Sequence, residues 1–155
     1  MKYITFSLAA LLLFSLVISQ AFSQIKPREY VGSKVCGECH VHEYANFTQY
    51  ASKSRSDDNV KLMLGKLTPE EQKECFECHT TGYGRPGGFV SFETTPDLGH
   101  AGCEVCHGPG SEHVSTEDPG MIIRDLSIEE HCAPCHEDER VRAINYKPLL
   151  YSGAH

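Results

Sequence analysis

Hydrophobic and polar positions divide this chain into a strongly apolar amino terminus and a longer remainder of mixed character. The stretch from Ile4 to Ile18 is apolar and is broken only by small hydroxyl residues. A lysine precedes it and small residues follow it, which is typical of a secretory signal peptide rather than a membrane span. We therefore expect residues 1–23 to be a cleaved signal peptide and residues 24–155 to form one domain. An uncleaved signal that anchors the protein is the alternative.

Beyond the apolar start, the pattern predicts short helices. Residues 38–54 are predicted to be helical because Tyr44 and Phe47, three positions apart, share one face. Residues 68–71 read Thr-Pro-Glu-Glu, which combines a capping threonine, a proline for the first turn and a glutamate that closes a capping box. Residues 127–130, Ser-Ile-Glu-Glu, repeat this signal and predict another helix start.

The segments between these helices are predicted to be irregular. Residues 80–102 are rich in glycine and proline, so we expect a loop with at most one short hairpin near Phe89. Residues 118–120, Asp-Pro-Gly, predict a turn. Residues 137–150 are expected to hold one more helix, which Pro148 limits. The fold class expected from this pattern is mainly α with long irregular loops.

The candidate chemistry lies in the pentapeptide Cys-x-x-Cys-His, which occurs four times and uses all 8 cysteines. The first to fourth motifs are residues 36–40, 75–79, 103–107 and 132–136, and their uneven spacing excludes a solenoid repeat. Cys-x-x-Cys-His is the attachment signature of c-type haem, in which two thiols add to the vinyl groups and the histidine binds the iron. The predicted attachment residues are Cys36, Cys39, Cys75, Cys78, Cys103, Cys106, Cys132 and Cys135, and the predicted proximal ligands are His40, His79, His107 and His136.

Zinc binding and disulfide formation account for the cysteines less well. Paired Cys-x-x-Cys units can bind structural zinc or form redox disulfides. Either role leaves the histidine after every second cysteine as a coincidence repeated four times. We therefore expect four covalently attached c-type haems. A chain this short, shared among four haems, cannot build much aliphatic core, so the porphyrins should form the core and the apo-protein should be largely unfolded.

The overall charge limits the kinds of partner. The formal net charge is −7, and haem propionates would make it more negative. An acidic surface argues against nucleic-acid binding and suits a partner protein with a basic docking face. The alternative is that the charge only keeps the protein soluble.

Four stretches of the chain form a recognisable set: Tyr30-Val-Gly-Ser33, Cys75-Phe-Glu-Cys-His-Thr-Thr-Gly-Tyr-Gly84, Pro86-Gly-Gly-Phe89 and Gly102-Cys-Glu-Val-Cys-His-Gly-Pro-Gly-Ser-Glu-His113. Together they resemble the tetrahaem cytochrome c-554 family. The resemblance implies a small, mainly helical, secreted electron carrier with closely packed haems. Members of the family include the acceptor of electrons from hydroxylamine oxidation, and related cytochromes polymerise into extracellular filaments.

The resemblance also implies distal iron ligands. It assigns His113 to the first haem and the terminal His155 to the third. The family usually carries the distal histidine of the fourth haem at the position that is Ser52 here, and its second haem is often open. His100 is the best spare ligand for the second haem. The histidines outside the motifs are His42, His100, His113, His131 and His155.

These observations predict a tetrahaem c-type cytochrome, periplasmic or extracellular, that relays single electrons between redox partner proteins. In this hypothesis no residue is catalytic. Two alternatives stay open. An open haem at the Ser52 gap would suit an enzyme acting on a small nitrogen species such as nitric oxide or hydroxylamine. Self-association into a filament would let a neighbouring molecule supply the missing ligand.

Overall fold

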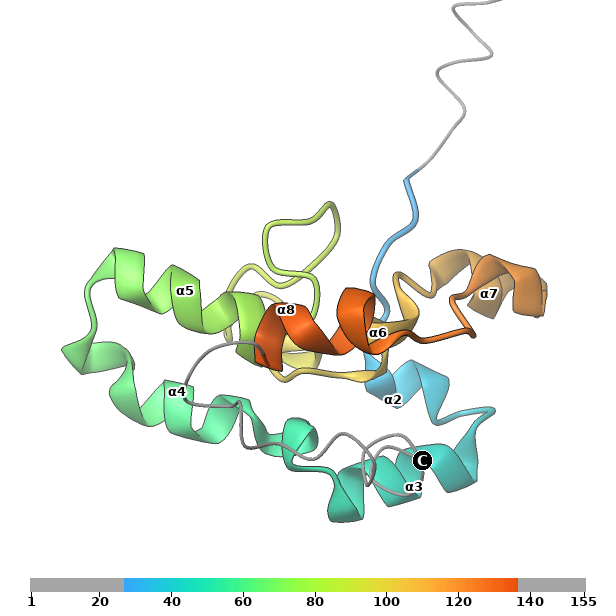
Figure 1. The fold of residues 1–155 in the computed structure, drawn as a ribbon, viewed down its shortest axis with the longest axis horizontal. Helices are drawn as coiled ribbons and strands as arrows, with labels where there is room; N and C mark the ends of the chain where they lie inside the picture. Colours follow the sequence, from blue (N-terminus) through green and yellow to red (C-terminus); the bar gives the residue numbers. More distant parts are fainter. Residues whose placement is uncertain (1–26, 137–155) are drawn as a thin grey trace, which may run out of the picture.

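The computed structural model describes residues 27–136 (Figure 1). The predicted signal peptide, the predicted helix at 137–150 and His155 lie outside the described residues. Within 27–136 the regular structure is helical, and no strand is present, which confirms the predicted fold class. The helices are α2 (Ser33–Cys36), α3 (Val41–Tyr50), η1 (Ser52–Arg55), α4 (Asp57–Met63), η2 (Leu64–Lys66), α5 (Pro69–His79), η3 (Pro96–Leu98), α6 (Cys103–His107), α7 (Ser111–Thr116), η4 (Pro119–Met121), η5 (Ile128–Cys132) and α8 (Ala133–His136).

The longest helices surround the short ones that carry the last two motifs. α3 and α4 run along one edge of the molecule, and α5 turns back to pack against α4 (Figure 1). α6 and α8 lie in the centre of this view, where η5 contacts both of them. All four motifs therefore lie in short helices or at helix ends rather than in separate lobes.

The helix predicted over 38–54 is shorter than expected. α3 begins only at Val41, because the residues of the first motif before it form separate turns. It ends at Tyr50, because the next residue, Ala51, is extended at φ −81° and ψ 122°. A separate 3₁₀ turn follows as η1. Tyr44 packs so closely on Gly37 that a Cβ there would meet the Tyr44 ring at 2.6 Å. The first motif and α3 therefore pack as one unit only because residue 37 is glycine.

Both predicted helix starts are present, in different forms. At α5 the Thr68 hydroxyl accepts from the Glu71 amide at 3.3 Å, and the Glu71 carboxylate accepts from the Thr68 amide at 2.8 Å, which confirms the capping box. At η5 the Ser127 hydroxyl accepts from the Glu130 amide at 3.2 Å. The turn that follows is π-helical rather than α-helical, and it leads directly into the fourth motif.

The loop over residues 80–102 is ordered around Thr81, which is only 1% exposed. Its amide donates to the Leu98 carbonyl and its carbonyl accepts from the Phe89 amide, both at 2.9 Å, and the segment contains no hairpin. Its hydroxyl donates to the His100 carbonyl at 2.6 Å. Buried backbone groups of an irregular segment need such partners, and Thr81 supplies three of them.

The apolar core of residues 27–136 is small. The buried hydrophobic side chains are Phe47, Val60, Phe89, Leu98, Ala101 and Ala133. A cluster of edge-to-face aromatic rings, with centroids 4.9 to 6.5 Å apart, joins α5 to the loop that follows it. This limited core agrees with the expectation that the chain is built around something other than its own side chains.

Candidate functional site

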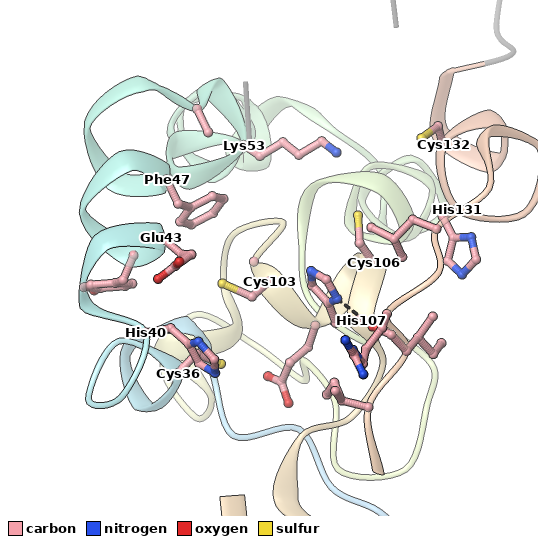
Figure 2. A pocket seen from close by; sticks show the side chains of 18 of the residues that line it. Cys36, His40, Glu43, Phe47, Lys53, Cys103, Cys106, His107, His131 and Cys132 are labelled. Carbon is pink, nitrogen blue, oxygen red and sulfur yellow. Dashed lines mark hydrogen bonds between the residues drawn. The ribbon is translucent and has the colours of Figure 1, made fainter. Parts of the chain in front are cut away.

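A cavity of about 610 Å³ lies within the described part of the chain (Figure 2). This volume lies in the range of cavities that enclose organic ligands of drug size. Three of the four motifs contribute side chains to its lining, together with α3, η1 and the segment around Ile123. The motif cysteines and histidines in the lining are Cys36, His40, Cys103, Cys106, His107, Cys132 and His136, and the other histidines there are His113 and His131.

The first and third motifs lie against each other. The thiols of Cys36 and Cys103 interact directly, and this interaction raises the pKa of Cys36 and lowers that of Cys103 to about 6. The Cys103 amide also donates to the Ser33 hydroxyl at 3.0 Å, which ties the start of α6 to the start of α2. Motifs separated widely in the sequence are thus paired in space.

The second and fourth motifs form a similar pair. Burial, then the charge and hydrogen bonding of Cys78, raise the pKa of the Cys135 thiol to about 12. The third and fourth motifs also meet, because burial raises the pKa of Cys106 and the neighbouring Cys132 adds to the rise. The contacts therefore connect the motifs in the spatial order first, third, fourth, second.

The ring of His40 in the first motif lies beside that of His113 in α7. The ring centroids of His40 and His113 are 6.2 Å apart, and their planes are inclined by 26°. The structure therefore brings the predicted proximal ligand His40 and the predicted distal ligand His113 to the lining of the same cavity.

Backbone carbonyl groups fix the rings of three predicted ligands. Because a carbonyl oxygen can only accept, the Nδ1 atom must carry the proton in each ring, which leaves the Nε2 lone pair for a metal. Histidine ligands are commonly held in this way. The contacts are His79 Nδ1 to Ser56 O at 2.7 Å, His107 Nδ1 to Ile123 O at 2.7 Å (dashed in Figure 2) and His113 Nδ1 to Asp118 O at 2.9 Å.

The position expected to hold the distal ligand of the fourth haem carries a serine, followed by a lysine, instead of a histidine. Ser52 is exposed at the start of η1, although it lies at the edge of the cavity. The next residue, Lys53, is half-buried and extends into the cavity from the side opposite Cys106 and Cys132 (Figure 2). Its charge adds to the effect of burial in lowering the pKa of His136. Sequence reasoning missed Lys53, and its proximity to the gap was the only signal that could have found it.

The remaining spare histidines have separate surroundings. His42 is exposed on α3. The His100 ring packs against Phe47 with centroids 5.9 Å apart, and burial lowers the pKa of His100. His131 lies in the lining of the cavity, with its Nδ1 atom 3.2 Å from the Ser127 carbonyl oxygen. Only His113 and His131 of the described spare histidines therefore line the cavity.

The residues present fit c-type haem. Each motif offers a pair of thiols followed by an imidazole, and the thiols and imidazoles of three motifs open onto one largely apolar space. The Nδ1 contacts described above prepare the opposite ring nitrogen for iron. Bound haem would supply one-electron chemistry at its iron.

No helix within residues 27–136 combines the length and the apolar character needed to cross a membrane.

Comparison with known proteins agrees with this chemistry. The family model described as "Cytochrome c554 and c-prime" matches residues 35–108, which include the first three motifs. Cytochrome c-554 of Nitrosomonas europaea is 28% identical to this chain over 174 residues, covering 95% of this chain and 70% of the relative. No solved structure matches the chain. Helical architecture, haem-attachment motifs and both sequence comparisons agree that the chain is a c-type cytochrome similar to the electron carriers of the cytochrome c554 family.

Proposed function

We propose that the chain is a secreted tetrahaem cytochrome that relays single electrons between redox partner proteins in the periplasm or outside the cell. In this role the eight motif cysteines attach four haems, and the four motif histidines bind iron on the proximal side. His113 is the distal ligand of the first haem and His155 that of the third. Residues 1–23 serve as the signal peptide.

The observation that carries the proposal is the spatial order of the motifs. The start of α6 is hydrogen-bonded to the start of α2, η5 contacts α6, and the Cys78 thiol lies close enough to Cys135 to influence its pKa. Electrons could then pass along the order first, third, fourth, second, in either direction, with no branch. The two ends of such a chain, at the first and second motifs, are where two different partner proteins would dock.

The histidine contacts support the carrier role. His40 and His113 lie close together in the lining of one cavity, which supports the assignment of both to the first haem. An iron with two histidine ligands exchanges electrons without binding substrate. The carbonyl contacts of His79 and His107 hold these rings in one orientation, which limits rearrangement when the iron changes charge.

Haem counting tests the proposal. The intact mass of the purified protein and its haem absorbance after denaturation in alkaline pyridine should both give four haems per chain. A double variant, Cys75→Ser with Cys78→Ser, should give three. Fewer than four haems in the unmodified protein, or a protein that does not exchange electrons with small redox mediators, would contradict the proposal.

A second candidate function rests on the surroundings of Ser52. An exposed serine and a cationic Lys53 stand where a distal histidine is expected, so the fourth iron would have an open position beside a positive charge. Such a site suits a small nitrogen species. Optical titration of the oxidised and reduced protein with nitric oxide and with hydroxylamine separates the two functions: a carrier should leave the spectrum unchanged, whereas an enzyme should bind and turn over the ligand.

A further inference from the structure

The third motif contains a buried carboxylate that the haem signature does not require. Glu104 lies between the two attachment cysteines of α6 and is only 2% exposed. Its carboxylate accepts hydrogen bonds from three backbone amides: from Val31 at 3.0 and 3.1 Å, from Gly32 at 2.8 Å and from Gly110 at 2.7 Å. Buried glutamates are uncommon unless they are paired, so this one needs a physical reason.

The hydrogen-bond pattern indicates that Glu104 is ionised. All three partners are N–H donors, and both carboxylate oxygens are used as acceptors. A protonated carboxyl group would place its own O–H among these donors without an acceptor. Hydrogen bonds to the charged form stabilise that form. Within residues 27–136 no lysine or arginine forms an ion pair with it, so its charge is balanced only by amide dipoles.

This charge lies close to two motifs at once. Glu104 is in the lining of the cavity together with Cys36 and Cys103. Its charge reaches both thiols: the pKa of Cys36 is raised first by its interaction with Cys103 and by burial, and Glu104 adds to the rise. For Cys103, Glu104 opposes the lowering of the pKa that the interaction with Cys36 causes. The carboxylate therefore acts on the pair formed by the first and third motifs.

We propose that Glu104 is a fixed buried charge that lowers the reduction potentials of the haems at the first and third motifs. Oxidised iron carries one more positive charge than reduced iron, so a nearby carboxylate favours the oxidised state. The effect is strong because burial removes most of the screening that water gives. Amide dipoles oppose the field of the carboxylate, but they carry partial charges and cannot cancel it. Net charge and burial are recognised determinants of haem potential.

The inference rests on the proposed relay and gives it a direction. Because Glu104 lies close to the first and third motifs, its charge shifts electrons at equilibrium toward the second and fourth haems. The first and third haems are then the end that holds electrons less firmly and passes them on most readily. Glu104 is a positioning and tuning residue, because it acts on the irons through the interior and does not bind them.

The experiment compares two charge-removing substitutions within haem motifs. Glu104→Gln removes the buried charge, and Glu38→Gln removes an exposed one inside the first motif. Redox titration of the holoproteins, followed optically and by EPR, gives the potentials of the individual haems. We expect Glu104→Gln to shift one or both potentials of the first pair to more positive values, clearly beyond any shift in Glu38→Gln, with the second pair nearly unchanged. Equal shifts in the two variants would overturn the inference.

Loss of structure is separated from loss of charge by a second variant. Glutamine places an amide N–H₂ among N–H donors, so Glu104→Gln could fail to accumulate as folded protein. Glu104→Asp keeps the negative charge, but its side chain is one methylene group shorter, so the carboxylate lies farther from the amides that donate to it. Its potentials should stay near those of the unmodified protein, and a positive shift beyond that of Glu38→Gln would contradict the inference. A normal haem count with unshifted potentials in Glu104→Gln would refute the role of Glu104 and leave the relay intact, whereas fewer than four haems in the unmodified protein would refute the relay itself.

Discussion

At the scale of single residues, histidine orientation is set by backbone carbonyl groups that come from other segments. The Ile123 carbonyl oxygen accepts a hydrogen bond from the His107 ring, and the Ser56 carbonyl oxygen accepts one from the His79 ring. Ser56 does more than this, since its hydroxyl donates to the His79 carbonyl and accepts from the Ala101 amide, both at 2.8 Å. The second motif is thus docked at the start of α4 by one small residue.

The first prediction concerns the distal ligand of the first haem. His113→Ala should convert one iron in the oxidised protein from low spin to high spin and leave the others unchanged, because only the partner of His40 is removed. EPR integrated against haem content measures this. The matched control is His42→Ala on the exposed face of α3, which should change nothing. Loss of all haem from His113→Ala would instead assign the residue a structural role.

The second prediction concerns the gap at Ser52. If the fourth haem is open, Ser52→His should supply its missing ligand and increase the low-spin signal at the expense of a high-spin one. The control is Ser54→His, because Ser54 is absent from the lining of the cavity. An unchanged spectrum in Ser52→His, or an equal change in the control, would show that the ligand position lies elsewhere.

At the scale of elements, local sequence signals predicted where helices begin, but they did not predict how long the helices are. The capping box at Thr68 involves residues three apart, so the sequence alone could identify it. The early end of α3 and the π-helical form of η5 could not be predicted, because both adjust a helix to the motif next to it. The attachment residues followed from spacing, whereas the partners of Glu104 could not, since Val31 is 73 residues away.

The third prediction concerns the cap of α5, which carries the second motif. Thr68→Ala should lower the free energy of unfolding by about 1 kcal/mol, because the Glu71 amide loses its acceptor. Denaturant titration of the holoprotein measures this. The exposed Lys73→Ala on the same helix should change it by less than about 0.5 kcal/mol. A loss as small as that of the control would show that the cap contributes nothing.

Acid should weaken the hydrogen bonds that the Glu71 carboxylate accepts from Thr68, because protonation removes the negative charge of the acceptor. Hydrogen bonds with the Thr68 amide and then its hydroxyl lower the pKa of Glu71. A carboxylate with a lowered folded pKa stabilises the fold above its unfolded pKa, about 4.3, and this contribution is lost as the pH falls through the folded value. Glu71→Gln should therefore reduce stability at pH 7 and have little effect at strongly acidic pH. A pH-independent effect of this substitution would contradict the assignment.

At the scale of the whole molecule, covalent attachment sites are spread over a chain with little core of its own. Six hydrophobic side chains are buried within residues 27–136, and two of them are alanines. Burial of this extent contributes little against the conformational entropy of ordering the chain. The small core could be predicted from chain length and motif count, but the pairing of the motifs could not, because it depends on contacts between distant segments.

The fourth prediction follows from this small core. The chain produced without haem attachment should show weak helical circular dichroism and no cooperative thermal transition, whereas the holoprotein should unfold cooperatively. Substituting all eight motif cysteines by serine gives the unattached chain. A cooperative transition in that variant would show that the polypeptide folds without its haems.

The hydrogen bonds of the opening segment have a consequence for the time course of folding. The Ser33 hydroxyl meets the Cys103 amide across 70 residues of sequence, and Glu104 meets Val31 across 73. Closing so long a loop costs little more free energy than closing a shorter one, but such contacts form late. A chain that emerges amino terminus first exposes the first motif well before its covering helix is available. That interval allows an attachment enzyme to reach the first motif before folding encloses it.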